Sequence, residues 1–252
     1  MNAEDVRKDP VLQGLVEGLH QALGPRLRSV VLYGSAARGD HHPAASDLNV
    51  IVVLDSLDPS TLEALAPAVS RFVRKGHPIP RLFSPGLIAA SADSFPIEFV
   101  DIRGGHIVLH GDDPFGSVAI ARDNLRLQLE REIKEKLMRL REAYVLVHDR
   151  ASALRRLLGQ SYPAFAALFR GGLHLMGRPV PSHSRDVVAA FCEAAGLDRA
   201  PFDEVARLRL GEKGTQDLRA IFARYYDALT RAAERIDRLY AEGGASKGGD
   251  SR

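Results

Sequence analysis

The chain has 252 residues, 45% of them hydrophobic and 26% charged, with a formal net charge of +2. This composition is typical of a soluble globular protein rather than a disordered or fibrous one, and the small net charge argues against extended nucleic-acid binding. A single cysteine, Cys192, excludes an intramolecular disulfide and a multi-cysteine zinc site, and no apolar run is long enough to span a bilayer. We therefore expect a cytoplasmic protein of two domains without a membrane partner.

The first part of the chain mixes helical and strand patterns. Apolar residues at helical spacing predict a helix over 11–23, and β-branched runs predict buried strands over 29–33 and 48–54. The further predicted elements are a helix over 60–75 and strands over 78–83, 97–102 and 106–110. Together they predict an α/β (α+β) domain with a mixed sheet over residues 1–115.

The second part of the chain changes to leucine-periodic, charge-laced segments. These predict helices over 125–147, 151–176, 184–195 and 216–241. We expect an all-α helical bundle domain over 120–242, with Cys192 in its core. A Gly/Ser-rich segment, 243–252, predicts a disordered tail.

Two charged groupings are interpreted as structural. Acids and bases alternate between Glu130 and Glu142, which predicts an exposed helix face with salt bridges. The pair His41-His42 predicts a solvated loop, because neighbouring side chains point apart and no third metal ligand is at hand.

A turn between two predicted strands carries a candidate phosphate site. Gly34 ends the first strand and allows a ligand to approach the backbone closely, and Ser35 begins a turn whose free N–H groups suit an anion. Arg38 adds a positive charge nearby.

Oxygen ligands follow this turn. Asp47 and Asn49 open the second strand two residues apart, so they are expected to share one face, as residues that grip a divalent metal do. The segment 97–102 offers two candidates for a third acid, Glu98 and Asp101. Strand alternation would send them to opposite faces, so at most one joins the site, and Glu98 is favoured.

The stretch from Val30 to Asp55 resembles the nucleotidyltransferase superfamily of DNA polymerase beta, particularly small bacterial enzymes related to aminoglycoside nucleotidyltransferases. The resemblance implies that Gly34 and Ser35 hold a triphosphate, and that Asp47 binds Mg²⁺ or Mn²⁺. It also implies that Glu98 completes the metal site or acts as a base. The implied reaction transfers a nucleoside monophosphate from a metal-bound nucleoside triphosphate to a hydroxyl of an unidentified small-molecule or protein acceptor.

Asn49 departs from this family pattern, which usually has a second carboxylate there. An amide oxygen can ligate a hard cation but brings no charge, so we expect nucleotide binding to survive more readily than turnover. Two other functions stay open. The chain is alternatively a degenerate nucleotide-binding or regulatory protein, or a partner-binding protein whose helical part mediates a homodimer or another complex.

Overall fold

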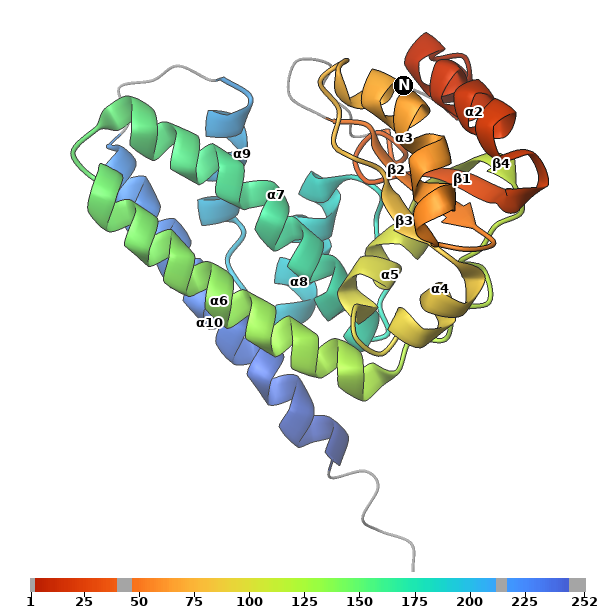
Figure 1. The fold of residues 1–252 in the computed structure, drawn as a ribbon. Coiled ribbons are helices and arrows are strands. Elements are labelled where there is room, and N and C mark those ends of the chain that lie inside the picture. The colour runs from red at the N-terminus through yellow and green to blue at the C-terminus, as the bar shows by residue number, and fades with distance from the viewer. Residues whose placement is uncertain (1–2, 40–46, 212–216, 245–252) are drawn as a thin grey trace, which may run out of the picture. The chain divides into compact units, whose positions relative to one another are not determined.

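The computed structural model describes residues 3–39, 47–211 and 217–244. The chain divides into two compact units, Met1–Ala121 and Arg122–Arg252 (Figure 1). His41 and His42 lie outside the described residues, as does the predicted tail from residue 245 onward.

The N-terminal unit is built around a four-stranded sheet with the order β3-β2-β1-β4. Strand β1 pairs antiparallel with both β2 and β4, while β2 and β3 are parallel, so the predicted mixed sheet is confirmed. The elements are α1 (Ala3–Arg7), α2 (Pro10–Leu23), a 3-10 turn (Gly24–Arg26), β1 (Leu27–Tyr33), β2 (Asn49–Leu54), α3 (Pro59–Val73), β3 (Arg81–Phe83), α4 (Pro85–Ser91), α5 (Pro96–Arg103) and β4 (His106–Gly111).

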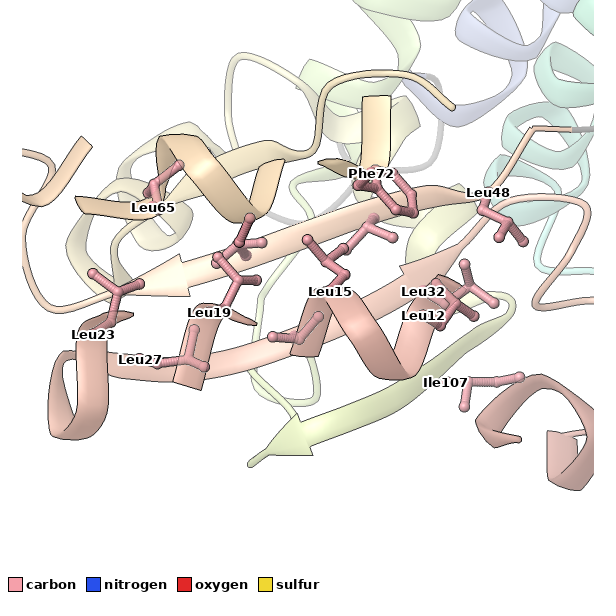
Figure 2. Packing of buried hydrophobic residues seen from close by; sticks show 14 of the residues in the cluster. Leu12, Leu15, Leu19, Leu23, Leu27, Leu32, Leu48, Leu65, Phe72 and Ile107 are labelled. Carbon is pink, nitrogen blue, oxygen red and sulfur yellow. The ribbon is translucent and has the colours of Figure 1, made fainter. Parts of the chain in front are cut away.

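Helices α2 and α3 cover one face of this sheet. Each begins at an aspartate N-cap, because Asp9 accepts hydrogen bonds from the backbone of Val11 and Leu12, and Asp58 accepts one from Thr61. Figure 2 shows the leucines of α2 meeting residues of β1 and α3 in one cluster. The labelled members are Leu12, Leu15, Leu19, Leu23, Leu27, Leu32, Leu48, Leu65, Phe72 and Ile107.

The opposite face carries a second core. Strand residues with odd numbers, Val31, Ile51 and Val53, pack there with Ile88 of α4 and with residues of α5. The further buried members of this cluster are Ala92, Phe99, Ile102 and Phe115. From Val30 onward, residues of β1 alternate between the two cores, as those of β2 do, which explains why both strands read as continuous apolar runs.

The predicted strand over 97–102 is wrong, because these residues form helix α5. Pro96 occupies the first turn of the helix, where a missing N–H costs nothing. The helix buries residues on several sides, so its apolar residues show no helical stripe. A short apolar run of this kind fits a strand or a buried helix equally well by periodicity.

The C-terminal unit is entirely helical over its described residues. Its helices are α6 (Arg122–Val147), α7 (Ala151–Leu175), α8 (Ser184–Ala195), α9 (Ala200–Arg209) and α10 (Leu218–Gly244). The four predicted helices are confirmed, whereas α9, like α4 in the first unit, was not expected. Among the described residues, no helix is both long and apolar enough to cross a membrane.

An aromatic core holds the helical unit together. Phe169 of α7 stacks on Phe191 of α8 with ring centroids 4.2 Å apart, and Phe202 of α9 meets Phe169 edge-on at 5.5 Å. Cys192 is buried in this unit, as expected, and burial raises the pKa of its thiol to about 12. Charges lie outside, in i,i+4 pairs such as Lys134–Glu130 and Arg139–Glu135, which confirms the predicted salt-bridged face.

Candidate active site

The turn after β1 requires its glycine. Gly34 has φ +81°, a region that other residues rarely adopt, and a Cβ there would lie 3.3 Å from the Nδ2 atom of Asn49. The chain then makes a single turn, in which the backbone N–H of Arg38 donates to the carbonyl of Gly34 at 3.2 Å. Ser35 lies half-buried inside that turn. Gly34 and Asn49 therefore lie close together.

Asn49 is the first residue of β2 and pairs across the sheet with Tyr33, the last residue of β1. Asp47 lies two residues earlier, outside the strand, with an exposed side chain. The expectation that a strand fixes Asp47 and Asn49 on one face is therefore wrong for Asp47. The reason is that β1 turns away at Gly34, so residues 47 and 48 have no strand partner on that side.

Helix α5 supplies both candidate acids to one region. Glu98 and Asp101 are three residues apart on a helix, so they lie on the same side, whereas the strand prediction had separated them. Burial is the main cause that raises the pKa of Tyr33, and the charges of Asp101 and Glu98 raise it further. The negative charges of both carboxylates therefore influence Tyr33, the last residue of β1, which precedes Gly34.

Asp101 is engaged by a residue from the turn. The guanidinium of Arg38 lies 3.1 Å from a carboxylate oxygen of Asp101, and the two side chains are only 8% and 20% exposed. Gly105 makes room for this pair, because a Cβ there would lie 2.3 Å from Cγ of Arg38. Arg38, the predicted nucleotide-binding cation, therefore belongs to a nearly buried ion pair that connects the turn to α5. Asp101 thereby contacts Arg38, and Glu98 lies one helical turn earlier on the same side of α5.

Sequence reasoning missed a further cation at this end of the sheet. Arg81 begins β3, and its guanidinium carbon lies over the ring of Tyr33 at 5.9 Å from the centroid. Its positive charge lowers the pKa of Tyr33, against the larger effect of burial. No local signal could have found this contact, because it depends on the order of three strands.

The match to known families falls on this part of the chain. The model of the nucleotidyltransferase domain family matches residues 13–78, which include Gly34, Ser35, Asp47 and Asn49. The N-terminal unit contains a nucleotidyltransferase domain. The match ends before α5, so it does not include Glu98.

Among solved structures, spectinomycin adenyltransferase AAD(9) from Enterococcus faecialis with ATP and spectinomycin is similar, with a TM-score of 0.55 and 12% sequence identity. The similarity covers 87% of this chain and 98% of that chain, so it extends beyond the nucleotidyltransferase domain into the helices. At this identity it concerns the fold, and it confirms a mixed-sheet unit followed by helices. No curated protein sequence matches the chain.

Three predicted site residues of the N-terminal unit carry oxygen atoms of the kind that a hard cation binds. Asp47 and Glu98 offer carboxylates, and Asn49 offers an amide oxygen, which are donors that Mg²⁺ accepts. Within the described residues, no three His, Cys, Asp or Glu side chains are grouped as a metal site. A donor set with only two carboxylates fits a cation that also receives oxygen ligands from substrate phosphates.

A pocket of about 550 Å³ lies at the opposite end of the same sheet face. Ser29 and Val53 form its floor with Ile88, and the exposed pair Arg28–Asp55 lies at its edge. None of the predicted site residues lines it. In the nucleotidyltransferase domain, this cavity therefore lies apart from the predicted site residues.

Proposed function

We propose that the protein transfers a nucleoside monophosphate from a nucleoside triphosphate to a hydroxyl group of an acceptor. One observation carries this proposal: the Gly34 turn lies in contact with Asn49 inside the matched nucleotidyltransferase residues. At this place the backbone of the turn meets the first residue of β2, with the amide of Asn49 beside Gly34.

Each residue has a distinct part in the proposed reaction. The turn at Gly34 and Ser35 binds the triphosphate through backbone N–H groups. Asp47, Asn49 and Glu98 would hold Mg²⁺ or Mn²⁺, which when bound neutralises charge on the phosphate oxygens. Glu98 accepts the proton of the acceptor hydroxyl, whose oxygen bonds to the α-phosphorus while the bond to pyrophosphate breaks.

The test is transfer of label from α-³²P nucleoside triphosphates, with Mg²⁺ or Mn²⁺, to acceptors. ATP and spectinomycin are the first pair to try, because the similar adenyltransferase was solved with both. A cell extract extends the search to unidentified acceptors. Label transfer that needs Asp47 supports the proposal, whereas no heat of binding with Mg-ATP or Mg-GTP at millimolar concentration would remove it.

A second candidate is nucleotide binding without turnover, and the orientation of Asn49 favours it. The amide nitrogen of Asn49 is its nearest atom to the space beside Gly34, so the side chain presents a hydrogen-bond donor toward the phosphate turn. In this role Asn49 binds a phosphate oxygen and does not ligate metal.

Asn49→Asp separates the two candidates. If Asn49 ligates metal, the added carboxylate strengthens Mn²⁺ binding and raises transfer, while lowering stability in chelator through repulsion from Asp47. If Asn49 donates to phosphate, the substitution weakens Mg-ATP binding and leaves the Mn²⁺-induced thermal shift unchanged. Thermal melts of the parent, Asn49→Asp and Asp47→Ala, each with chelator and with Mn²⁺, give the answer.

A further inference from the structure

The proposed triphosphate site needs a cation that faces it, and Arg38 does not supply one. The Arg38 side chain is 8% exposed and its guanidinium contacts Asp101. Arg81, in contrast, is exposed. Within the described residues, Arg81 donates no hydrogen bond and makes no ion pair. Its guanidinium contacts the ring of Tyr33. Its N–H donors are thus available.

Sheet order places the Arg81 side chain over the site. Arg81 pairs with Ile51 in β2, so both residues point to the face that also carries Asn49. Tyr33 belongs to β1, on the far side of β2, and two strand spacings amount to roughly 10 Å. To lie over the Tyr33 ring, the arginine must extend across β2, at the end of the sheet where Asn49 begins the strand.

The surroundings explain why this arginine stays in place without a carboxylate partner. The ring of Tyr33 supports the guanidinium through a cation–π contact, which does not use the N–H donors at the edges of the group. The charges of Glu98 and Asp101 act on the same tyrosine. Arg81 therefore sits among groups that hold a cation in the neighbourhood of Gly34, the residue that follows Tyr33.

We propose that Arg81, supported by Tyr33, is the phosphate-binding cation of the site and makes it prefer nucleoside triphosphates over monophosphates. This inference rests on the proposed function, since it concerns the same nucleotide site. The guanidinium forms charge-assisted hydrogen bonds with phosphate oxygens, and a ligand with more phosphate charge gains more from them.

Calorimetry with Mg-ATP, Mg-AMP and inorganic tripolyphosphate tests the proposal on the parent and on Arg81→Ala. We expect the substitution to weaken Mg-ATP and tripolyphosphate about 10- to 100-fold, and Mg-AMP by less than about threefold. Arg81→Lys keeps the positive charge without the planar guanidinium, so its affinity for Mg-ATP is expected to lie between those of the parent and Arg81→Ala. Tyr33→Phe keeps the ring and stays near the parent, whereas Tyr33→Leu removes the support and weakens Mg-ATP.

Arg74→Ala is the matched control. Arg74 is an exposed arginine at the end of α3, whose core residues pack on the other face of the sheet, so its removal makes the same change in net charge as Arg81→Ala. Unchanged Mg-ATP affinity in Arg81→Ala would overturn the inference and leave the proposed function standing. Equal losses for Mg-ATP and Mg-AMP would also overturn it. A parent protein that binds neither nucleotide nor tripolyphosphate would remove both the proposed function and the inference.

Discussion

The two units each contain a glycine that no other residue can replace freely, and they use it for different ends. In the N-terminal unit, Gly34 has a positive φ and borders the amide of Asn49. In the helical unit, Gly172 has ordinary helical geometry, and a Cβ there would lie 2.6 Å from the ring of Phe191. The first glycine gives backbone access at a polar edge, whereas the second gives room for packed rings.

Charges differ between the units in the same way. The N-terminal unit places the Arg38–Asp101 pair almost out of solvent, beside the candidate site. The helical unit keeps pairs such as Arg139–Glu135 at its surface, where they contribute little to stability. The comparison indicates that changes around the Gly34 turn of the first unit should alter ligand binding, whereas changes in the aromatic core of the second unit should alter stability alone.

The largest expected effect is the loss of transfer in Asp47→Ala. Removing the exposed carboxylate should reduce label transfer on the order of a thousandfold, because a metal ion contributes several kcal/mol to the transition state. Stability in chelator should not change, since Asp47 lies outside the core. Asp112→Ala, an exposed aspartate at the other end of the sheet, is the control. Equal rates in both variants would contradict the assignment.

Breaking the Arg38–Asp101 pair should affect stability and ligand binding together. Arg38→Met removes the guanidinium that faces a largely buried carboxylate and should lower the free energy of unfolding by about 3 kcal/mol. Mg-ATP binding should weaken as well, because the pair connects the Gly34 turn to α5. The double variant Arg38→Met/Asp101→Leu should recover most of the stability. Urea unfolding and calorimetry would measure both quantities, and a double variant no more stable than the single one would argue against a simple charge effect.

Gly172→Ala should destabilise the helical unit by about 1–3 kcal/mol, because the stacked ring of Phe191 cannot move aside. Its neighbour Gly171 is an internal control. A Cβ at Gly171 meets Leu129 at 3.4 Å, an ordinary contact, and alanine favours a helix over glycine by about 1 kcal/mol. We expect Gly171→Ala to match or exceed the parent in thermal melts, with Mg-ATP affinity unchanged in both. Weakened nucleotide binding in Gly172→Ala would contradict the expectation that this glycine affects stability alone.

The smallest effect concerns the cap of α3. Hydrogen bonds from Ser60, Ser56 and Thr61 lower the pKa of Asp58 well below its ordinary value of 3.8. A lowered pKa means that the charged cap stabilises the folded state above pH 3.8, and that this contribution declines as the pH falls below it. Asp58→Ala should therefore lower Tm near pH 7 but differ less from the parent near pH 3. A Tm difference independent of pH would show that the charge is not involved.

Local patterns in the sequence were enough to predict much of this protein. The helix over 11–23 and the strands around 29–33 and 48–54 follow from apolar spacing, because alternation and helical periodicity depend only on nearby residues. The turn at Gly34 could also be predicted, since only glycine accommodates its backbone easily.

Tertiary structure decided the rest of the candidate site. Residues 96–103 became a helix because they are buried on several sides, a property that the apolar run itself does not reveal. Arg38 pairs with Asp101, 63 residues away, and Arg81 reaches Tyr33 across an intervening strand. Such contacts depend on sheet order and on which helix covers which face. The sequence by itself determined most of the elements and the glycine turn after β1, whereas only the packing of distant segments determined which charges lie near that turn.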